Sequence, residues 1–218
     1  MPVSDGPLSL PARLCLVGWD AARPPSGATV RLPGLVRAGA LVELARQGLL
    51  RDEDGIAVPA DPDALAGDAV LDGLLELVHE SCPHPWRTWV TLRSRVTLDA
   101  VREQLVAGGY LRAEKRRVLG VFPSVEYALG RPAAVEALRE EVRQALRGPL
   151  PVAALGERDA AVAALAAAAG LFAQEGAAAG RRVGELTERA GQAAPGLGRI
   201  VREVRVAVAG AVRAPASL

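Results

Sequence analysis

The sequence is poor in the residues that build disulfide frameworks, metal sites and catalytic triads. It contains two cysteines, Cys15 and Cys82, and two histidines, His79 and His84. Two cysteines are too few for a secreted disulfide framework, so we expect a reducing, cytoplasmic compartment. His79, Glu80, Cys82 and His84 lack the paired spacing of zinc ligands, and neither a G-x-S-x-G nor a phosphate-loop motif is present. The sequence therefore predicts no metal, no cofactor and no enzymatic activity.

We also find no pattern of a secretory signal or of a transmembrane helix in the sequence. Residues 1–11 contain Asp5 and no basic stretch of the kind that opens a secretory signal. The longest apolar run, residues 160–173, has 14 residues, whereas a helix needs roughly 20 to cross a bilayer. We therefore expect no transmembrane helix, and any membrane role would be peripheral.

Asparagine is absent, and 25 of the 26 basic residues are arginine, with Lys115 the single lysine. This composition is typical of a GC-rich, bacterial genome, so the arginine count alone is no evidence for phosphate binding. The position of the charges is more informative. Residues 40–82 hold ten acidic and two basic side chains, whereas residues 85–117 hold eight basic and three acidic ones. This asymmetry points to an anionic partner for the basic part.

Hydrophobic periodicity predicts a mainly α fold with small β-hairpins, in one domain over residues 8–213 with flexible termini at 1–7 and 214–218. The sequence is 50% apolar, which is globular composition. Asp68 stands where it can cap the helix that follows it. Helices are expected over residues 9–20, 33–47, 69–80, from about 97 to 107, and over 132–147, 158–174 and 198–213.

One local pattern occurs twice. The string LARQGLLR at 44–51 is paralleled by LVAGGYLR at 105–112, 61 positions later, and each is followed by a hairpin pattern, over 49–58 and 112–127. Two helix-plus-wing units are also the pattern of winged-helix proteins, so a DNA-binding regulator is the alternative function. A DNA-binding wing should be polar and basic at its apex. The second hairpin, KRRVLGVFP at 115–123, has an apolar apex behind a basic collar, which favours an anionic membrane surface and makes nucleic acid an unlikely partner.

The strings LVELARQG (41–48), AGDAVLD (66–72), Trp89, LVAGGYLRAEK (105–115) and LGVFP (119–123), in this order and spacing, resemble the Golgi phosphoprotein 3 (GPP34) family. The resemblance and the composition imply a bacterial, actinobacterial member of a non-enzymatic family with one mainly helical domain. The resemblance further implies binding of phosphatidylinositol 4-phosphate and recruitment of a membrane-protein or glycosyltransferase client. For this chain it implies a cytoplasmic location, peripheral on the inner face of the cell membrane.

The resemblance also implies a lipid headgroup site. Two of the four family positions fall on Arg37 and Arg95, whereas the other two fall on Ala28 and Leu98, which cannot bind a phosphate by charge. Arg31, Arg93 and Arg102 are the possible substitutes. A membrane-inserting hairpin is expected to use Lys115, Arg116, Arg117, Val118, Leu119, Val121 and Phe122; alternatively, this hairpin packs on the core or forms a homo-oligomer contact.

Overall fold

The computed structural model describes residues 8–19, 31–118, 122–172, 176–192 and 197–213. The described part is mainly helical with two small antiparallel sheets, as the sequence predicts. The helices are α1 (Leu10–Val17), α2 (Arg31–Arg46), α3 (Ala69–Glu80), α4 (Trp86–Thr91), α5 (Ser94–Ala107), α6 (Pro132–Arg147), α7 (Glu157–Ala168), α8 (Gly176–Ala190) and α9 (Leu197–Arg213). The strands are β1 (Leu50–Glu53), β2 (Ile56–Pro59), β3 (His84–Pro85), β4 (Leu111–Val118) and β5 (Phe122–Leu129).

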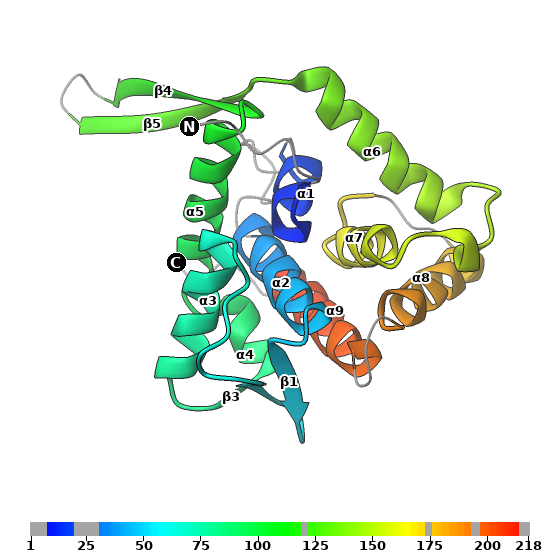
Figure 1. Ribbon diagram of the computed structural model, residues 1–218. Helices are drawn as coiled ribbons and strands as arrows, with labels where there is room; N and C mark the ends of the chain where they lie inside the picture. Colours follow the sequence, from blue (N-terminus) through cyan, green and yellow to red (C-terminus); the bar gives the residue numbers. More distant parts are fainter. Residues whose placement is uncertain (1–7, 20–30, 119–121, 173–175, 193–196, 214–218) are drawn as a thin grey trace.

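Helix α2 is the central element of the fold. Every residue from 32 to 45 is buried, because α2 contacts α1, α5, α7 and α9 on different sides. Figure 1 shows α3, α4 and α5 on one side of it and α6, α7 and α8 on the other. A helix that is buried on every side has no solvated polar face and must be enclosed in this way. The buried residues of the described chain form one core cluster that extends from Leu10 to Val208.

The repeated sequence pattern produces the same helix ending twice. At the end of α2 the N–H of Leu49 donates to the carbonyl of Leu44, and at the end of α5 the N–H of Tyr110 donates to that of Leu105, each at 2.9 Å. Gly48 and Gly109 have φ of 76° and 71°, the left-handed conformation in which a glycine ends a helix without steric cost. Each ending leads directly into an antiparallel hairpin, β1–β2 and β4–β5. The two predicted helix-plus-wing units are therefore confirmed.

A small third strand and a short helix, α4, join the first hairpin to the core. Residues 84 and 85 of β3 pair with β2, and the indole N–H of Trp86 donates to Asp52 at 2.7 Å. The other oxygen of Asp52 lies 3.0 Å from Nη1 of Arg199 on α9. Asp52 is thus a partly buried acceptor that ties the hairpin to two helices, α4 and α9.

The C-terminal half differs from the predicted boundaries. The helix expected over 158–174 ends at Ala168, because the N–H of Leu171 turns back to the carbonyl of Ala166. The helix expected over 9–20 likewise ends early, at Val17. Helix α8 was not predicted; it packs on α7 and α9, and its Arg182 donates to the carbonyls of Ala145 and Leu150, each at 2.8 Å.

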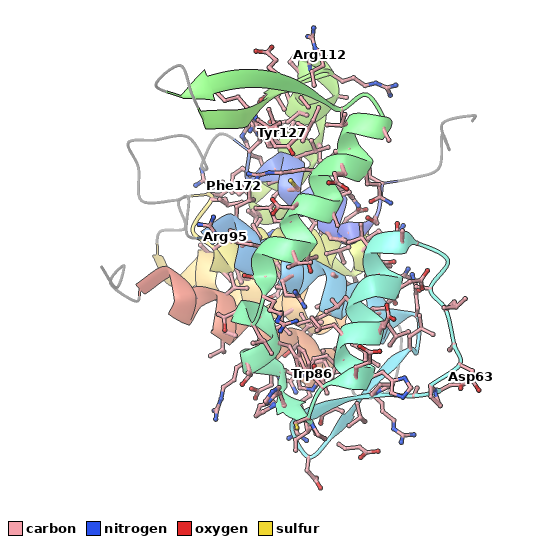
Figure 2. All side chains as sticks on the ribbon, turned by 90° about the vertical axis from the view of Figure 1, so that its left-hand side faces the viewer. Asp63, Trp86, Arg95, Arg112, Tyr127 and Phe172 are labelled. Carbon is pink, nitrogen blue, oxygen red and sulfur yellow. The ribbon has the colours of Figure 1, made fainter. Side chains whose placement is uncertain are left out.

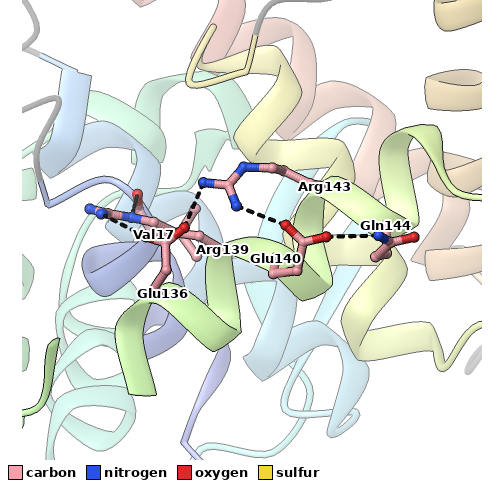
Figure 3. Close-up of polar contacts among 6 residues, drawn as sticks. All are labelled: Val17, Glu136, Arg139, Glu140, Arg143 and Gln144. Atoms are coloured by element: carbon pink, nitrogen blue, oxygen red, sulfur yellow. Dashed lines mark hydrogen bonds and ion pairs between the residues drawn. The ribbon is translucent and has the colours of Figure 1, made fainter. Parts of the chain in front are cut away.

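The outer face of α6 is a self-contained charge ladder (Figure 3). Arg143 donates to Glu136 and to Glu140, each at 2.8 Å, and Gln144 donates to Glu140 at 2.7 Å. Hydrogen bonds from Gln144 and Arg143 lower the pKa of Glu140, and those to Glu140 and Glu136 raise the pKa of Arg143. The charges on this face are already paired with one another, so it offers little to an outside anion.

Gly130, where the second hairpin meets α6, lies where the backbone leaves no room for a side chain. Its N–H donates to the carbonyl of Tyr110 at 2.8 Å, and a Cβ at this position would collide with the carbonyl oxygen of Gly109. Gly130→Ala is expected to lower the free energy of unfolding by about 1–3 kcal/mol, because the backbone must move apart. Gly73→Ala, in the exposed middle of α3 where a methyl group meets open space, is the control and should raise it by about 0.5–1 kcal/mol. Urea unfolding of both variants tests the pair; equal effects would contradict the close approach.

Candidate functional site

Two charged side chains of the described chain are buried, and both lie on α2. The first, Glu43, is paired with two arginines: its Oε1 accepts from Nη2 of Arg46 at 2.6 Å and from Nη2 of Arg158 on α7 at 2.7 Å. Burial by itself would raise the pKa of Glu43, but the hydrogen bonds from Arg46 and Arg158 outweigh it and lower the pKa. Glu43, Arg46 and Arg158 therefore form a structural ion cluster between α2 and α7.

The second buried charge, Arg37, has no compensating carboxylate among the described residues. Its side chain is 1% exposed, and its Nη2 donates to the carbonyl of Arg93 at 2.8 Å. Within the part of the chain that the structure describes, Nε and Nη1 have no hydrogen-bond partner, and no carboxylate pairs with this guanidinium. Burial lowers the pKa of Arg37 to about 10, so the group stays charged at neutral pH at a cost in free energy. A bound anion would relieve that cost.

The carbonyl that Arg37 holds belongs to the sharp elbow between α4 and α5. Arg93 has φ 49° and ψ 29°, a left-handed conformation that is uncommon for a residue with a side chain. The side chains of Arg93 and Arg95 are exposed on the outside of the elbow. The first turn of α5 contains no acidic residue and has no side-chain cap, so its free N–H groups add partial positive charge. The predicted residues Arg37, Arg93 and Arg95 are thus brought to one end of α5.

The other predicted headgroup residues have different environments. Leu98 is 4% exposed and belongs to the core, which explains why an apolar side chain is accepted there. Arg102 stacks on Trp19 and Tyr127 and pairs with Asp99 at 3.4 Å. Ala28 lies outside the described residues, and so does the side chain of Arg31.

The second hairpin carries the predicted membrane contact. Strands β4 and β5 pair from Leu111–Leu129 out to Val118–Phe122, and the hairpin projects from one end of the molecule (Figure 1). Leu119 and Val121 lie outside the described residues, and of Lys115, Arg116, Arg117, Val118 and Phe122 only the backbone is described. Val125, on β5, is 49% exposed, so apolar surface is present on the projecting part.

The hairpin and the α5 arginines belong to one side of the molecule. The hairpin projects toward the side on which α5 lies in Figure 1, and Figure 2 views that side face-on, with Arg95 beside α5 and Arg112 on the hairpin. A flat anionic surface approaching from this side would meet both. The first hairpin, β1–β2, lies at the opposite end of the molecule.

Sequence reasoning missed the aromatic partners of Arg102 and the burial of Glu43. The spacing of Glu43 and Arg46 is that of a helical ion pair, so half of this cluster was visible in the sequence. Arg158, 115 positions away, was not. Trp19 follows α1, Tyr127 lies on β5 and Arg102 lies on α5. Only the tertiary structure brings these three elements together.

Among the described residues, no helix is both long and apolar enough to cross a membrane. A search of curated proteins found no match to this chain. The family model for Golgi phosphoprotein 3 (GPP34) matches residues 10–207, most of the chain. This family is a non-enzymatic lipid-binding and adaptor family, in agreement with the prediction that the chain is not an enzyme. The chain belongs to the Golgi phosphoprotein 3 (GPP34) family.

Proposed function

We propose that this chain is a peripheral membrane protein that binds anionic phospholipid headgroups at the α4–α5 elbow. Arg93 and Arg95 contact the headgroup phosphate, and Arg37 supplies a fixed positive charge beneath them. The observation that carries the proposal is the buried guanidinium of Arg37, which has no carboxylate partner among the described residues and donates to the carbonyl of the exposed Arg93. Guanidinium groups bind phosphate oxygens through paired, directional hydrogen bonds. The hairpin over residues 115–122 supplies the second contact, with the acyl boundary.

Phosphatidylinositol 4-phosphate is the lipid for which the family is known, and we propose a headgroup of this phosphoinositide type. Because Ala28 and Leu98 replace a tryptophan and a basic residue of the family pattern, selection of the 4-phosphate should be weaker than the selection that the full set of four groups provides. The chain would then also bind abundant anionic lipids such as phosphatidylglycerol, on the inner face of the cell membrane. A membrane-protein client held at that surface would complete the adaptor role.

Co-sedimentation with vesicles tests the proposed function. Vesicles of phosphatidylcholine alone are compared with vesicles that also contain phosphatidylglycerol, phosphatidylinositol or phosphatidylinositol 4-phosphate, and a mobility-shift assay with duplex DNA runs in parallel. We expect binding to all the anionic vesicles, strongest with phosphatidylinositol 4-phosphate, and none to the neutral ones. Salt-sensitive DNA binding at micromolar or tighter affinity without vesicle binding would instead support the winged-helix alternative.

Arg37→Met separates a binding role of Arg37 from a structural one. The substitution removes a buried charge that has no carboxylate partner in the described part of the chain, so the melting temperature should stay the same or rise despite the lost hydrogen bond to Arg93. Binding to anionic vesicles should fall about tenfold, which corresponds to about 1.4 kcal/mol and is slightly more than one cation contributes near an anionic leaflet.

Arg51→Met is the control for this substitution. Arg51 is an exposed arginine on β1, which lies at the opposite end of the molecule from the β4–β5 hairpin (Figure 1). Its charge is paired with Glu53 at 2.8 Å, so the substitution should leave vesicle binding unchanged. A large fall in the melting temperature of Arg37→Met with unchanged vesicle binding would show that Arg37 only supports the fold.

A further inference from the structure

Arg102, on α5, joins three elements that are distant in sequence. Its guanidinium carbon lies 5.9 Å from the ring centre of Trp19, just after α1, and 5.2 Å from that of Tyr127, on β5. The two rings meet edge to face, with their centres 6.5 Å apart. We call Arg102, Trp19 and Tyr127 the Arg102 cluster. A guanidinium within about 6 Å of an aromatic ring centre is attracted to the face of that ring.

The Arg102 cluster is partly screened from water, which strengthens the contact. The side chain of Arg102 is 24% exposed, and its Nε is buried without a hydrogen-bond partner among the described residues. Its charge also acts on α1: burial raises the pKa of Cys15 to about 12, and the nearby Arg102 partly opposes this rise. Because Arg102 already contacts two rings and Asp99, we interpret it as an internal contact of the fold and not as a headgroup ligand.

The cluster holds one side of the base of the β4–β5 hairpin. A second contact lies where the chain enters the hairpin: Arg131 is 4.9 Å from the ring centre of Tyr110. Further out, at the pair Glu114–Glu126, both described side chains are exposed. A two-stranded hairpin is marginally stable by itself, so contacts at its base set its direction.

The length of the hairpin makes that direction important. From Tyr127 to Phe122 the strand advances five residues, which at about 3.3 Å per residue is roughly 17 Å. A small rotation at the base therefore moves the apex by several ångströms relative to α5. The same helix carries Arg95 near its start and Arg102 two turns later.

We propose that Arg102 is a positioning residue for membrane attachment. By stacking on Trp19 and Tyr127 it fixes the angle between the β4–β5 hairpin and α5, so that the hairpin apex and the Arg93–Arg95 elbow reach a bilayer together. The membrane part of this inference rests on the proposed function. The fixed angle of the hairpin does not, and it can be measured in solution without lipid.

Hydrogen exchange of the full-length protein tests the fixed hairpin. Arg102→Met and Tyr127→Leu each remove one side of the stacking contact, and both should speed exchange of the β4–β5 amides about tenfold. Tyr127→Phe keeps the ring and should exchange like wild type, and Arg102→Lys, which keeps the charge, should lie between. Because the two partners act as one contact, the double variant should be no faster than the single ones. Arg143→Met, on the charge ladder of α6, is the control and should leave the hairpin unchanged.

Two binding measurements then test positioning. For Arg102→Met, affinity for vesicles of phosphatidylcholine with phosphatidylinositol 4-phosphate should fall about tenfold, whereas affinity for the soluble headgroup glycerophosphoinositol 4-phosphate should not change. A purely structural role would lower both together. Unchanged exchange in Arg102→Met and Tyr127→Leu would overturn the fixed hairpin, and faster exchange with unchanged vesicle binding would overturn positioning. If wild type binds no vesicles, the proposed function and positioning fail together, while exchange still decides whether Arg102 fixes the hairpin.

Discussion

Glu43→Ala is expected to lower the free energy of unfolding by about 3 kcal/mol, the largest single effect on stability that we predict. Glu43 is 1% exposed and accepts hydrogen bonds from Arg46 and Arg158. Removing one partner of a buried ion cluster typically costs about 3–5 kcal/mol, because the remaining charges lose their compensation. The lower value applies here because the side chains of Arg46 and Arg158 are 28% and 32% exposed and can turn toward water.

Thermal unfolding measures this effect with a matched control. At about 2–4 °C per kcal/mol for a chain of this size, the melting temperature should fall by roughly 6–12 °C. Glu140 accepts the same kinds of hydrogen bonds, from Arg143 and Gln144, but on the exposed face of α6 (Figure 3). Glu140→Ala should therefore leave the melting temperature almost unchanged. Similar shifts for the two variants would contradict the importance of burial.

The same cluster predicts a dependence on pH. The folded-state pKa of Glu43 is below its ordinary value of 4.5, so folding favours the ionised carboxylate. This stabilisation is complete above about pH 4.5 and is lost as the pH falls through the lowered folded-state pKa. The difference in unfolding free energy between wild type and Glu43→Gln should be constant at neutral pH and should shrink in acid. A difference that grows in acid would mean that folding raises the pKa of Glu43 instead of lowering it.

The elements that could be predicted are those with local determinants. Asp68 accepts hydrogen bonds from the N–H groups of Val70 and Leu71 and begins α3 at the expected residue. Gly48 and Gly109 end their helices through a backbone conformation that the sequence already favours. Pro132 starts α6 where predicted, since proline fits the first turn of a helix. In each case the residues that decide the boundary lie within one helical turn of it.

The elements that could not be predicted depend on partners elsewhere in the chain. Helix α8 begins with the sequence GAAAG, which has weak helix preference at both glycines, and it forms against α7 and α9. Strand β3 is two residues long and exists through its pairing with β2. No periodicity can be recognised in so short a segment.

The candidate site divides in the same way. The resemblance and the charge pattern identified Arg37, Arg93 and Arg95, but not that Arg37 is buried and holds the carbonyl of Arg93, 56 positions away. Arg102 was predicted as a possible headgroup ligand because it is basic and near Arg95. Its stacking on Trp19 and Tyr127 depends on how α1 and β5 pack around α5, which the sequence does not encode locally.

The largest effect on membrane attachment is expected from the hairpin apex. Leu119→Asp combined with Phe122→Asp should weaken binding to anionic vesicles at least about a hundredfold. A fully buried Leu or Phe side chain contributes about 1.5–3 kcal/mol, and a charge at the acyl boundary opposes insertion. Apolar burial does not depend on ionic strength, so the loss should be similar at every salt concentration and for every anionic headgroup. Circular dichroism must show the wild-type helical content for the comparison to hold.

Arg93→Gln combined with Arg95→Gln should behave differently. Two cations near an anionic leaflet contribute about 1 kcal/mol each, so binding should weaken about thirtyfold at low salt. The Debye length falls from about 10 Å at 0.1 M to about 3 Å at 1 M, and the loss should vanish over this range. Arg51→Gln with Arg143→Gln lowers the net charge equally, through two carboxylate-paired arginines away from the elbow, and should have a much smaller effect. Equal losses for both charge pairs would mean that net charge alone, and not the elbow, attracts the bilayer.

Sedimentation mass decides what the hairpin contacts. If the apex inserts into lipid, the aspartate double variant should keep the mass of wild type in solution and lose vesicle binding. If it binds vesicles like wild type but changes in mass, the hairpin is a contact between copies of this chain. Membrane affinity must then come from the elbow arginines alone, and the salt dependence of wild type should match full electrostatic screening. The salt series of the unmodified protein therefore separates the two arrangements before any substitution is made, because only apolar insertion leaves binding that persists at 1 M salt.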